Sequence, residues 1–265
     1  MKYGIIGCGV MGSAIAAALC KTAGARQVLL ANRHREKAEM LATRLGCSVG
    51  ENSDAALCDY VILAVKPQMM RDMLLPLRDV FSARKLPPIL VSVAAGLTIA
   101  TLREMAGFNA SMVRLMPNTP AAIGMGMIPY CADGVGEEAL ADLLRDLSAA
   151  GLLDEIPESL MDAASCVSGC GPAWCFKMLE ALADGGVACG LPRQKALMYA
   201  AKMMEGSAAL LLAEEKHPGQ MKDAVCSPGG STIQGVRVLE ERGFRGAVMD
   251  AVMAAYAKNA ELGKN

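Results

Sequence analysis

Three glycines near the N-terminus have the spacing of a phosphate-binding turn. Gly7, Gly9 and Gly12 follow the apolar run 3–6 and open a stretch with helical character. In that context Gly-x-Gly-x-x-Gly is typical of dinucleotide binding, because the first glycine permits a tight turn and the second lets a pyrophosphate approach the backbone. The third lets helix and strand pack closely, and the free N–H groups of the helix then face the phosphates. A glycine-rich turn without a ligand is the alternative.

The residues after the next apolar run are basic where an acid is common. Many NAD enzymes place Asp or Glu here to accept a hydrogen bond from the ribose 2′-OH. This chain has no acid between Arg26 and Arg35, and the run ends in Asn32, Arg33 and His34. Because an amide can donate and a guanidinium can neutralise a 2′-phosphate, the sequence predicts a preference for NADP over NAD. A solvated basic loop is the alternative, and His34 is expected to be an exposed bystander.

A second motif for holding an anion lies near the other end of the chain. Residues 226–235 read CSPGGSTIQG, which places proline, two glycines and two hydroxyl residues directly before a helical pattern. A tight turn followed by a helix cap at Ser231 and Thr232 explains these residues without a ligand. Free N–H groups, two hydroxyls and the positive helix end also form a cradle for a carboxylate. We favour the cradle, because a nucleotide-binding domain needs a substrate site.

Two further loops follow strand-like runs. They read AVKPQ (64–68) and SVAAG (92–96), and both lie where an open α/β sheet binds its ligand, at the carboxyl ends of strands. Small residues there let a cofactor lie against the backbone. Lys66 is a candidate donor to ribose or phosphate, with an ordinary surface lysine as the alternative.

Alternating segments position these motifs. Strand-like runs occur at 3–6, 27–31, 60–65, 89–93 and 111–116, and helical stretches at 12–23, 34–45, 68–83 and 98–106. We expect a parallel sheet with helices on both faces, finished by a strand near 127–131, a helix near 136–150 and a strand near 152–156. After Pro157 only helical periodicity remains, and 210–213 should be buried on more than one side. The fold class is therefore α/β: a Rossmann-like, doubly wound sheet over 1–157, followed by an all-helical domain over 158–265.

Composition narrows the choice of partners. The 265 residues are 53% hydrophobic but 4% aromatic, which leaves apolar surface for a second subunit. A net charge of −1 without a basic stripe argues against nucleic acid. Ten scattered cysteines indicate reduced thiols, a cytoplasmic location and no metal site. The uncharged runs 3–20 and 86–102 contain glycine or proline and suit neither a signal peptide nor a membrane span.

Several segments in a fixed order resemble the pyrroline-5-carboxylate reductase family along nearly the whole chain. They are GCGVMG, AVKPQ, SVAAG, MPNTP, SGCGPAW, DGGVACGLPR and HPGQMKDAVCSPGGSTI. The resemblance implies reduction of the C=N bond of Δ1-pyrroline-5-carboxylate to L-proline by hydride transfer from NADPH or NADH, the final step of proline biosynthesis. It also implies a homodimer formed through the helical domains, which would make 158–265 a dimerisation domain, with further assembly into decamers.

The resemblance implies roles for individual residues. Gly230, Ser231 and Thr232 would bind the substrate carboxylate, with Thr232 also reaching the ring nitrogen as the catalytic contact. Glu215 matches an acid near the ring amine, and Glu158 another acid at the start of the helical domain. Asn52 would contact the adenosine end, and 93–95 would flank the nicotinamide. The full cofactor set is Gly7, Cys8, Gly9, Val10, Met11, Gly12, Asn32, Arg33, Asn52, Ala64, Val65, Lys66, Pro67, Val93, Ala94 and Ala95.

Two other functions stay open at this point. A related NADP-linked reductase of the hydroxyacid or imine type would share the architecture, but Lys177 and Lys195 lack the setting of a hydroxyacid enzyme's catalytic lysine. A nucleotide sensor would need the glycine turn but has no use for 228–232. The chain departs from the family pattern at Cys170, Trp174 and Ala224, and the last leaves cofactor affinity open. No histidine lies in a relay, so orientation and electrostatics are the expected means of catalysis.

Overall fold

The computed structural model describes residues 1–262 of the 265-residue chain. Contacts divide the chain into two compact units, one made of Met1–Pro172 with the segment that follows Ala254, the other of Ala173–Ala254. The expected boundary at 157 coincides with the end of the sheet, since the last strand stops at Glu155. As a boundary between two domains it stays a prediction, and positions 263–265 of the second domain lie outside the described residues.

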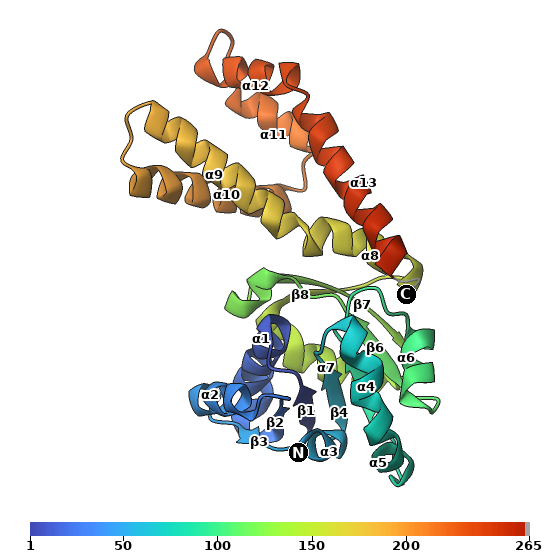
Figure 1. Ribbon diagram of the computed structural model, residues 1–265. Helices are drawn as coiled ribbons and strands as arrows, with labels where there is room; N and C mark the ends of the chain where they lie inside the picture. The colour runs from blue at the N-terminus through green and yellow to red at the C-terminus, as the bar shows by residue number, and fades with distance from the viewer. Residues whose placement is uncertain (263–265) are drawn as a thin grey trace. The chain divides into compact units, whose positions relative to one another are not determined.

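An eight-stranded sheet forms the centre of the first unit (Figure 1). The strand order is β3-β2-β1-β4-β5-β6-β7-β8, and every neighbouring pair is parallel except β6 and β7. The strands are β1 (Tyr3–Ile6), β2 (Val28–Ala31), β3 (Ser48–Val49), β4 (Tyr60–Leu63), β5 (Ile89–Ser92), β6 (Met112–Leu115), β7 (Gly126–Asp133) and β8 (Gly151–Glu155).

The antiparallel pair corrects the expectation of a wholly parallel sheet. The chain between β6 and β7 holds only a short 3-10 helix, Thr119–Ile123. A parallel return needs a crossover of a dozen or more residues, usually with a helix, whereas a shorter loop leads back antiparallel. The other expected strands are confirmed, including β7 and β8, which pair in parallel around helix α7 (Glu137–Leu147).

Two-sided burial explains the continuous apolar strands. Every residue of β1, β2 and β4 is buried. Successive side chains of β4 enter different apolar clusters, with Ile62 on one face of the sheet and Val61 and Leu63 on the other. Helices α1 (Val10–Leu19), α2 (Arg35–Leu45) and α7 pack into the first cluster. The second contains α3 (Asn52–Ala56), α4 (Met70–Leu74), α5 (Arg78–Ser82) and α6 (Ile99–Ala106).

Three local features differ from the expected helices and strands. The helix expected over 68–83 is divided into α4, a 3-10 turn at Leu75–Leu77 and α5. Pro76 lies in that turn, and proline lacks the N–H group that would continue the helix. Helix α1 ends at Leu19 and passes into a π-helical turn. The short elements β3 and α3 were not expected, because so few residues give no clear periodicity.

Helices make up the rest of the described chain. After the short α8 (Met161–Ala164) come α9 (Gly171–Ala188), α10 (Arg193–Glu214), α11 (Pro218–Val225), α12 (Ser231–Glu241) and α13 (Phe244–Leu262). No strand follows β8 in residues 156–262, as the sequence predicts.

Helix α10 carries an exposed apolar surface. Leu210 and Leu212 are 52% and 79% exposed, so the expected burial of 210–213 is not found within the single chain. By length and composition alone α10 could cross a membrane, with a mean hydropathy of 1.2 over the best window and 11% of that window buried. From the sequence, 210–213 was marked for burial, and only the runs 3–20 and 86–102 were considered as membrane spans.

Candidate active site

A cavity of about 750 Å³ lies at the carboxyl ends of β1, β2 and β4. It brings together a large part of the predicted cofactor set, although Val10, Met11, Gly12, Pro67 and 93–95 are not in its lining. The lining residues are Ile6, Gly7, Cys8, Gly9, Asn32, Arg33, His34, Lys37, Asn52, Ala64, Val65, Lys66, Met69, Asp72 and Met73. Lys37, Met69, Asp72 and Met73 were missed by sequence reasoning, which gave no signal for them beyond their nearness to predicted loops.

The glycine turn has the geometry that the spacing predicts. Gly7 has a φ of +111°, which favours glycine, and its N–H donates to the Ala31 carbonyl at 2.8 Å. A Cβ on Gly12 would collide with the Gly7 carbonyl oxygen, so this position requires close backbone approach. A Cβ on Gly9 would meet no protein atom within 4 Å. Packing therefore gives no reason for glycine at Gly9, whereas a bound pyrophosphate would.

The side chain of Asn32 holds the glycine turn against the end of β2. Its Oδ1 accepts a hydrogen bond from the Cys8 N–H at 2.9 Å, and its Nδ2 donates to the His34 carbonyl at 2.9 Å. The sequence pointed to Asn32 as a donor to the cofactor, but one of its donor sites is already in use. The described structure therefore gives Asn32 a positioning role, and direct contact with the cofactor stays a prediction.

The two arginines after β2 have different surroundings. Arg35 forms ion pairs with Glu39 and Glu51, each at 2.9 Å. Arg33 lines the cavity and forms no ion pair with any acid in the described part of the chain. Its charge is therefore available to an anion, as is that of Lys37 beside it. His34 is exposed, as expected, but it also lines the cavity and precedes α2 as its N-cap.

The thiol at the cavity is not a nucleophile. Burial raises the pKa of Cys8 to about 11, so its thiol stays protonated at neutral pH. All ten cysteines are free thiols. Within residues 1–262 no group of three His, Cys, Asp or Glu side chains is placed to hold a metal ion.

In the second unit, the motif SPGGST forms a turn that opens directly into α12. The Gly230 N–H donates to the Ser227 carbonyl at 3.0 Å, and Gly229 has a φ of +70°. With Pro228 before that glycine, these are the features of a type II turn. Ser231 and Thr232 were expected at the cap, but the N-cap is Gly230 and the two hydroxyl residues are the first residues of the helix. No side chain caps this helix, so its first amides and both exposed hydroxyls are available to an anion.

Glu215 has an unusual backbone conformation at the end of α10. Its φ is +52°, and it is the one non-glycine residue with positive φ among those that the structure describes. Helices commonly place glycine at this left-handed position, because a Cβ there costs about 1–2 kcal/mol. Strain of this kind is more common at functional sites, which supports the role predicted for the Glu215 side chain.

Glu158 lies in the first unit, where its side chain is already engaged. Its Oε1 accepts a hydrogen bond from the Ile99 N–H at 2.7 Å and lies 3.4 Å from Nη1 of Arg114. Arg114 is buried in β6 and also pairs with Asp162 at 3.1 Å. The sequence predicts that Glu158 contacts the substrate and does not single out Arg114. The sequence did contain a signal for Arg114, because an arginine within a strand that is covered on both faces must be buried and needs acidic partners.

Comparisons with known proteins find relatives along the whole chain. The family model described as pyrroline-5-carboxylate reductase dimerisation matches residues 158–262, and one described as NADP oxidoreductase, coenzyme F420-dependent, matches 2–96. A pyrroline-5-carboxylate reductase of Synechocystis is 42% identical over 270 residues, which cover 100% of this chain and 99% of the relative. The Escherichia coli enzyme of that name is 37% identical over 269 residues, covering 100% and 99%. The chain belongs to the pyrroline-5-carboxylate reductase family.

The solved structures place this reductase in the same family. The Plasmodium falciparum pyrroline carboxylate reductase with NADP bound has a TM-score of 0.89 at 30% identity, with 99% of this chain and 98% of that chain covered. A prephenate dehydrogenase of Aquifex aeolicus has a TM-score of 0.51 at 13% identity, which shows a shared fold alone. The α/β fold class, the recognition of the family and the use of NAD(P)H are thereby confirmed.

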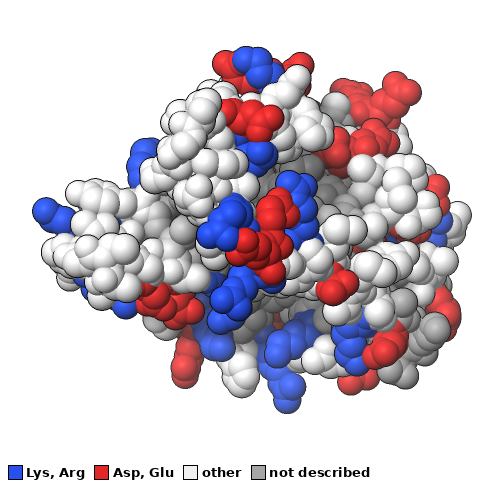
Figure 2. Space-filling view, turned by 90° about the horizontal axis from the view of Figure 1, so that it is seen from above, with Lys and Arg blue, Asp and Glu red and all other residues white. Residues whose placement is uncertain are grey.

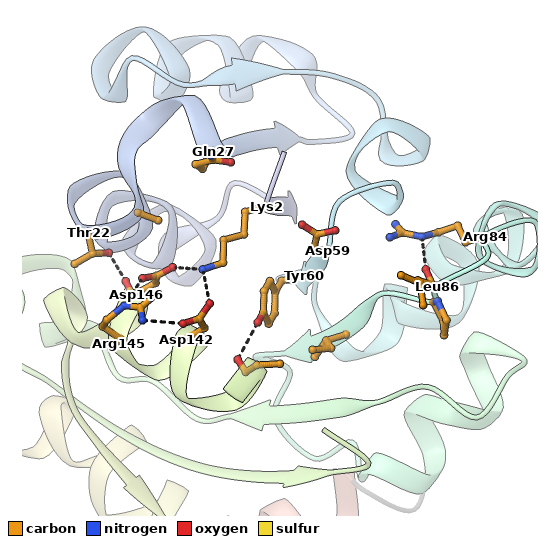
Figure 3. A pocket seen from close by; sticks show the side chains of 14 residues that line it. Lys2, Thr22, Gln27, Asp59, Tyr60, Arg84, Leu86, Asp142, Arg145 and Asp146 are labelled. Atoms are coloured by element: carbon orange, nitrogen blue, oxygen red, sulfur yellow. Dashed lines mark hydrogen bonds and ion pairs between the residues drawn. The ribbon is translucent and has the colours of Figure 1, made fainter. Parts of the chain in front are cut away.

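A second cavity of this reductase, of about 810 Å³, lies at the opposite, amino edge of the sheet (Figure 3). Lys2 Nζ lies 2.7 Å from Oδ2 of Asp146, which also accepts from the Tyr3 hydroxyl at 2.7 Å. Burial alone would raise the pKa of Asp146, but the hydrogen bonds from Lys2 and Tyr3 outweigh it and hold that pKa below its ordinary value. Arg145 and Asp142 form a further pair at 2.7 Å. These charges satisfy one another, so we assign them to the stability of the fold.

Proposed function

We propose that this reductase converts Δ1-pyrroline-5-carboxylate to L-proline, the final step of proline biosynthesis, with NADPH as its preferred cofactor and NADH as a second donor. The observation that carries the proposal is the uncapped start of α12, where backbone amides and the hydroxyls of Ser231 and Thr232 are available to an anion. A substrate carboxylate is such an anion. A protein that only senses a nucleotide would have no use for this second anion site.

The cavity at the carboxyl edge of the sheet is suited to the cofactor. Bound NADPH supplies the hydride. The amides of the Gly7–Gly12 turn hold the pyrophosphate, and the room beside Gly9 lets it approach. Arg33 neutralises the 2′-phosphate, since its guanidinium has no ion-pair partner in residues 1–262, and Asn52 contacts the adenosine end. The remaining contacts are Cys8, Val10, Met11, Ala64, Val65, Lys66 and Pro67, with Val93, Ala94 and Ala95 beside the nicotinamide.

The substrate contacts come mainly from the second unit. The backbone at Gly230, Ser231 and Thr232 holds the carboxylate, and the amides of Ser231 and Thr232 are its donors, because the Gly230 N–H already donates to the Ser227 carbonyl. The Thr232 hydroxyl orients the ring nitrogen and is the catalytic contact, while the Glu215 carboxylate stabilises the positive charge of a protonated imine. Glu158 contributes its second carboxylate oxygen, Oε2, which accepts no hydrogen bond from the described residues.

This arrangement needs no general acid to protonate the nitrogen during hydride transfer. A protonated imine is already electrophilic, and its nitrogen becomes a neutral amine without receiving a further proton during the reaction. A ketone would instead form an alkoxide that has to be protonated. The residues of this chain then serve to orient the substrate and to stabilise its charge.

The assembly is a homodimer formed through the helical region, with decamers as a larger form, and its location is the cytoplasm. The exposed leucines of α10 and the match of 158–262 to a dimerisation model support a second copy of this chain as the cover for that apolar surface. Neither nucleic acid nor a membrane is a proposed partner. On the face drawn in Figure 2, basic and acidic side chains are interspersed and form no continuous basic stripe.

Cofactor absorbance tests this function directly. Purified protein should oxidise NADPH when Δ1-pyrroline-5-carboxylate is added, and should leave it unchanged with 2-keto acids or 3-oxo acids. Oxidation with those acids instead would favour a reductase of the hydroxyacid type. Cofactor binding without turnover on any of these compounds would favour a nucleotide sensor.

A further inference from the structure

Helix α6 receives part of its N-terminal cap from a distant part of the chain. The first amide of the helix, the Ile99 N–H, donates to Oε1 of Glu158 at 2.7 Å. The Thr101 N–H is capped locally by the side chain of Thr98, at 3.1 Å. A carboxylate at this position is also favoured by the helix dipole. Glu158 thus fixes the point at which the loop after β5 becomes a helix.

Arg114 in turn fixes Glu158. Its Nη1 lies 3.4 Å from Glu158 and its Nη2 3.1 Å from Asp162, and its side chain is 3% exposed. Its Nε is buried without a hydrogen-bond partner among residues 1–262. A buried guanidinium depends on its acidic partners, because burying it unpaired is strongly destabilising. The guanidinium of Arg114 therefore has a defined position, and the partly exposed carboxylates of Glu158 and Asp162 meet it there.

The loop held by this arrangement is the one predicted to flank the nicotinamide. At its start, the Val93 N–H donates to the Leu63 carbonyl at 3.2 Å and the Ala94 N–H to the Ser92 hydroxyl at 3.2 Å. At its end lies the Ile99–Glu158 hydrogen bond. Gly96, between the two ends, has a φ of +75°. The loop is therefore held at both ends, and at its far end the Glu158 carboxylate adds a contact from outside the helix to the local cap by Thr98.

We propose that Glu158, held by Arg114, is a positioning residue that sets the conformation of the loop 93–98 and thereby the affinity for the nicotinamide half of the cofactor. This inference rests on the proposed function, which places that loop beside the nicotinamide. It differs from the substrate contact that the sequence predicts for Glu158, because it acts through the Ile99 amide and concerns cofactor binding.

The test compares two ligands in Glu158→Ala, Glu158→Gln and the wild-type protein. NADPH contains both halves of the cofactor, whereas adenosine 2′,5′-bisphosphate lacks the nicotinamide half. In Glu158→Ala we expect the Kd for NADPH to rise about tenfold, as for loss of one charge-assisted hydrogen bond, and the Kd for the bisphosphate to stay within about twofold. Glu158→Gln keeps an acceptor oxygen and should restore part of the loss. Glu104→Gln, on the exposed surface of the same helix, should change neither value.

Three outcomes are decisive. An unchanged Kd for NADPH in Glu158→Ala, with a raised KM for Δ1-pyrroline-5-carboxylate, would overturn the inference in favour of direct substrate contact. An equal rise of the Kd values for both ligands, together with a lower Tm, would show that Glu158 contributes only to the stability of the fold. A wild-type protein that binds NADPH but reduces no pyrroline-5-carboxylate would contradict the proposed function alone, since the binding comparison needs no turnover.

Discussion

Arg35 lies 2.9 Å from the carboxylate of Glu51, and this ion pair separates its role from that of its neighbour Arg33. Glu39 binds the same guanidinium from the next turn of α2. Two acids thus neutralise Arg35, while Arg33 lines the cofactor cavity without such a partner in the described chain. The difference predicts which arginine distinguishes NADPH from NADH.

Replacing Arg33 should reduce the preference for NADPH. In Arg33→Ala we expect kcat/KM for NADPH to fall about 10–100-fold, because the 2′-phosphate loses a charge-assisted contact, while kcat/KM for NADH changes little. Arg35→Ala is the matched control and should leave the ratio of the two values nearly unchanged. Steady-state rates with both cofactors measure this ratio. An equal ratio in Arg33→Ala and the wild type would show that Arg33 does not contact the 2′-phosphate.

Replacing Glu215 should affect the stability of the protein and its turnover in different ways. In Glu215→Gly the strained φ of +52° becomes comfortable, so Tm should be equal to or above that of the wild type. Turnover should fall, because the carboxylate that stabilises the charged imine is gone. Glu214→Gln changes the neighbouring acid, which pairs with Lys216 at 2.6 Å, and should keep normal turnover. Normal turnover in Glu215→Gly would refute the role of Glu215.

The network at the amino edge predicts how stability depends on pH. The pKa of Asp146 is lowered in the fold, so its contribution to stability is present above its unfolded pKa, near 3.8, and is lost as pH falls through the folded value. Asp146→Asn should lower the free energy of unfolding at pH 7 by about 2 kcal/mol, since the buried Tyr3 hydroxyl and the half-buried Lys2 lose a charged partner. Urea unfolding at pH 7 and pH 3 measures both effects. A difference between variant and wild type that does not shrink at pH 3 would contradict this account.

Much of the sheet could be predicted because burial on both faces makes β1, β2 and β4 continuously apolar. The direction of a strand could not be predicted in the same way, since the same apolar pattern fits a parallel and an antiparallel strand. The antiparallel β7 follows from the length of the connection after β6 and not from its residues. The break at Pro76 had a visible signal in the sequence, whereas the two-residue strand β3 is too short for any pattern.

The site was predictable where the backbone alone determines it. Glycine is required at Gly7 by its positive φ and at Gly12 by the close approach of the Gly7 carbonyl oxygen. The spacing of the two glycines in the sequence reflects both requirements. The engagement of Asn32 with the Cys8 amide depends instead on how β1 and β2 lie in register, which no local pattern contains. The hydrogen bond between the Ile99 amide and Glu158 was missed for the same reason, because the two residues are distant in the sequence.

Thr232 should matter for catalysis and not for cofactor binding. In Thr232→Ala we expect kcat/KM for Δ1-pyrroline-5-carboxylate to fall about 100-fold, as for the loss of one positioned hydrogen bond, with the Kd for NADPH unchanged. Thr232→Ser keeps the hydroxyl and should restore most of the activity. Since the first turn of α12 lacks a side-chain cap, neither change should lower Tm appreciably.

The most direct test of the central claim is a crystal structure of this reductase with NADP and L-proline. We predict that the proline carboxylate lies against the backbone of Gly230, Ser231 and Thr232 and accepts hydrogen bonds from the Ser231 and Thr232 amides, with the ring nitrogen within hydrogen-bond distance of the Thr232 hydroxyl. Proline bound elsewhere, with the start of α12 empty, would contradict the account.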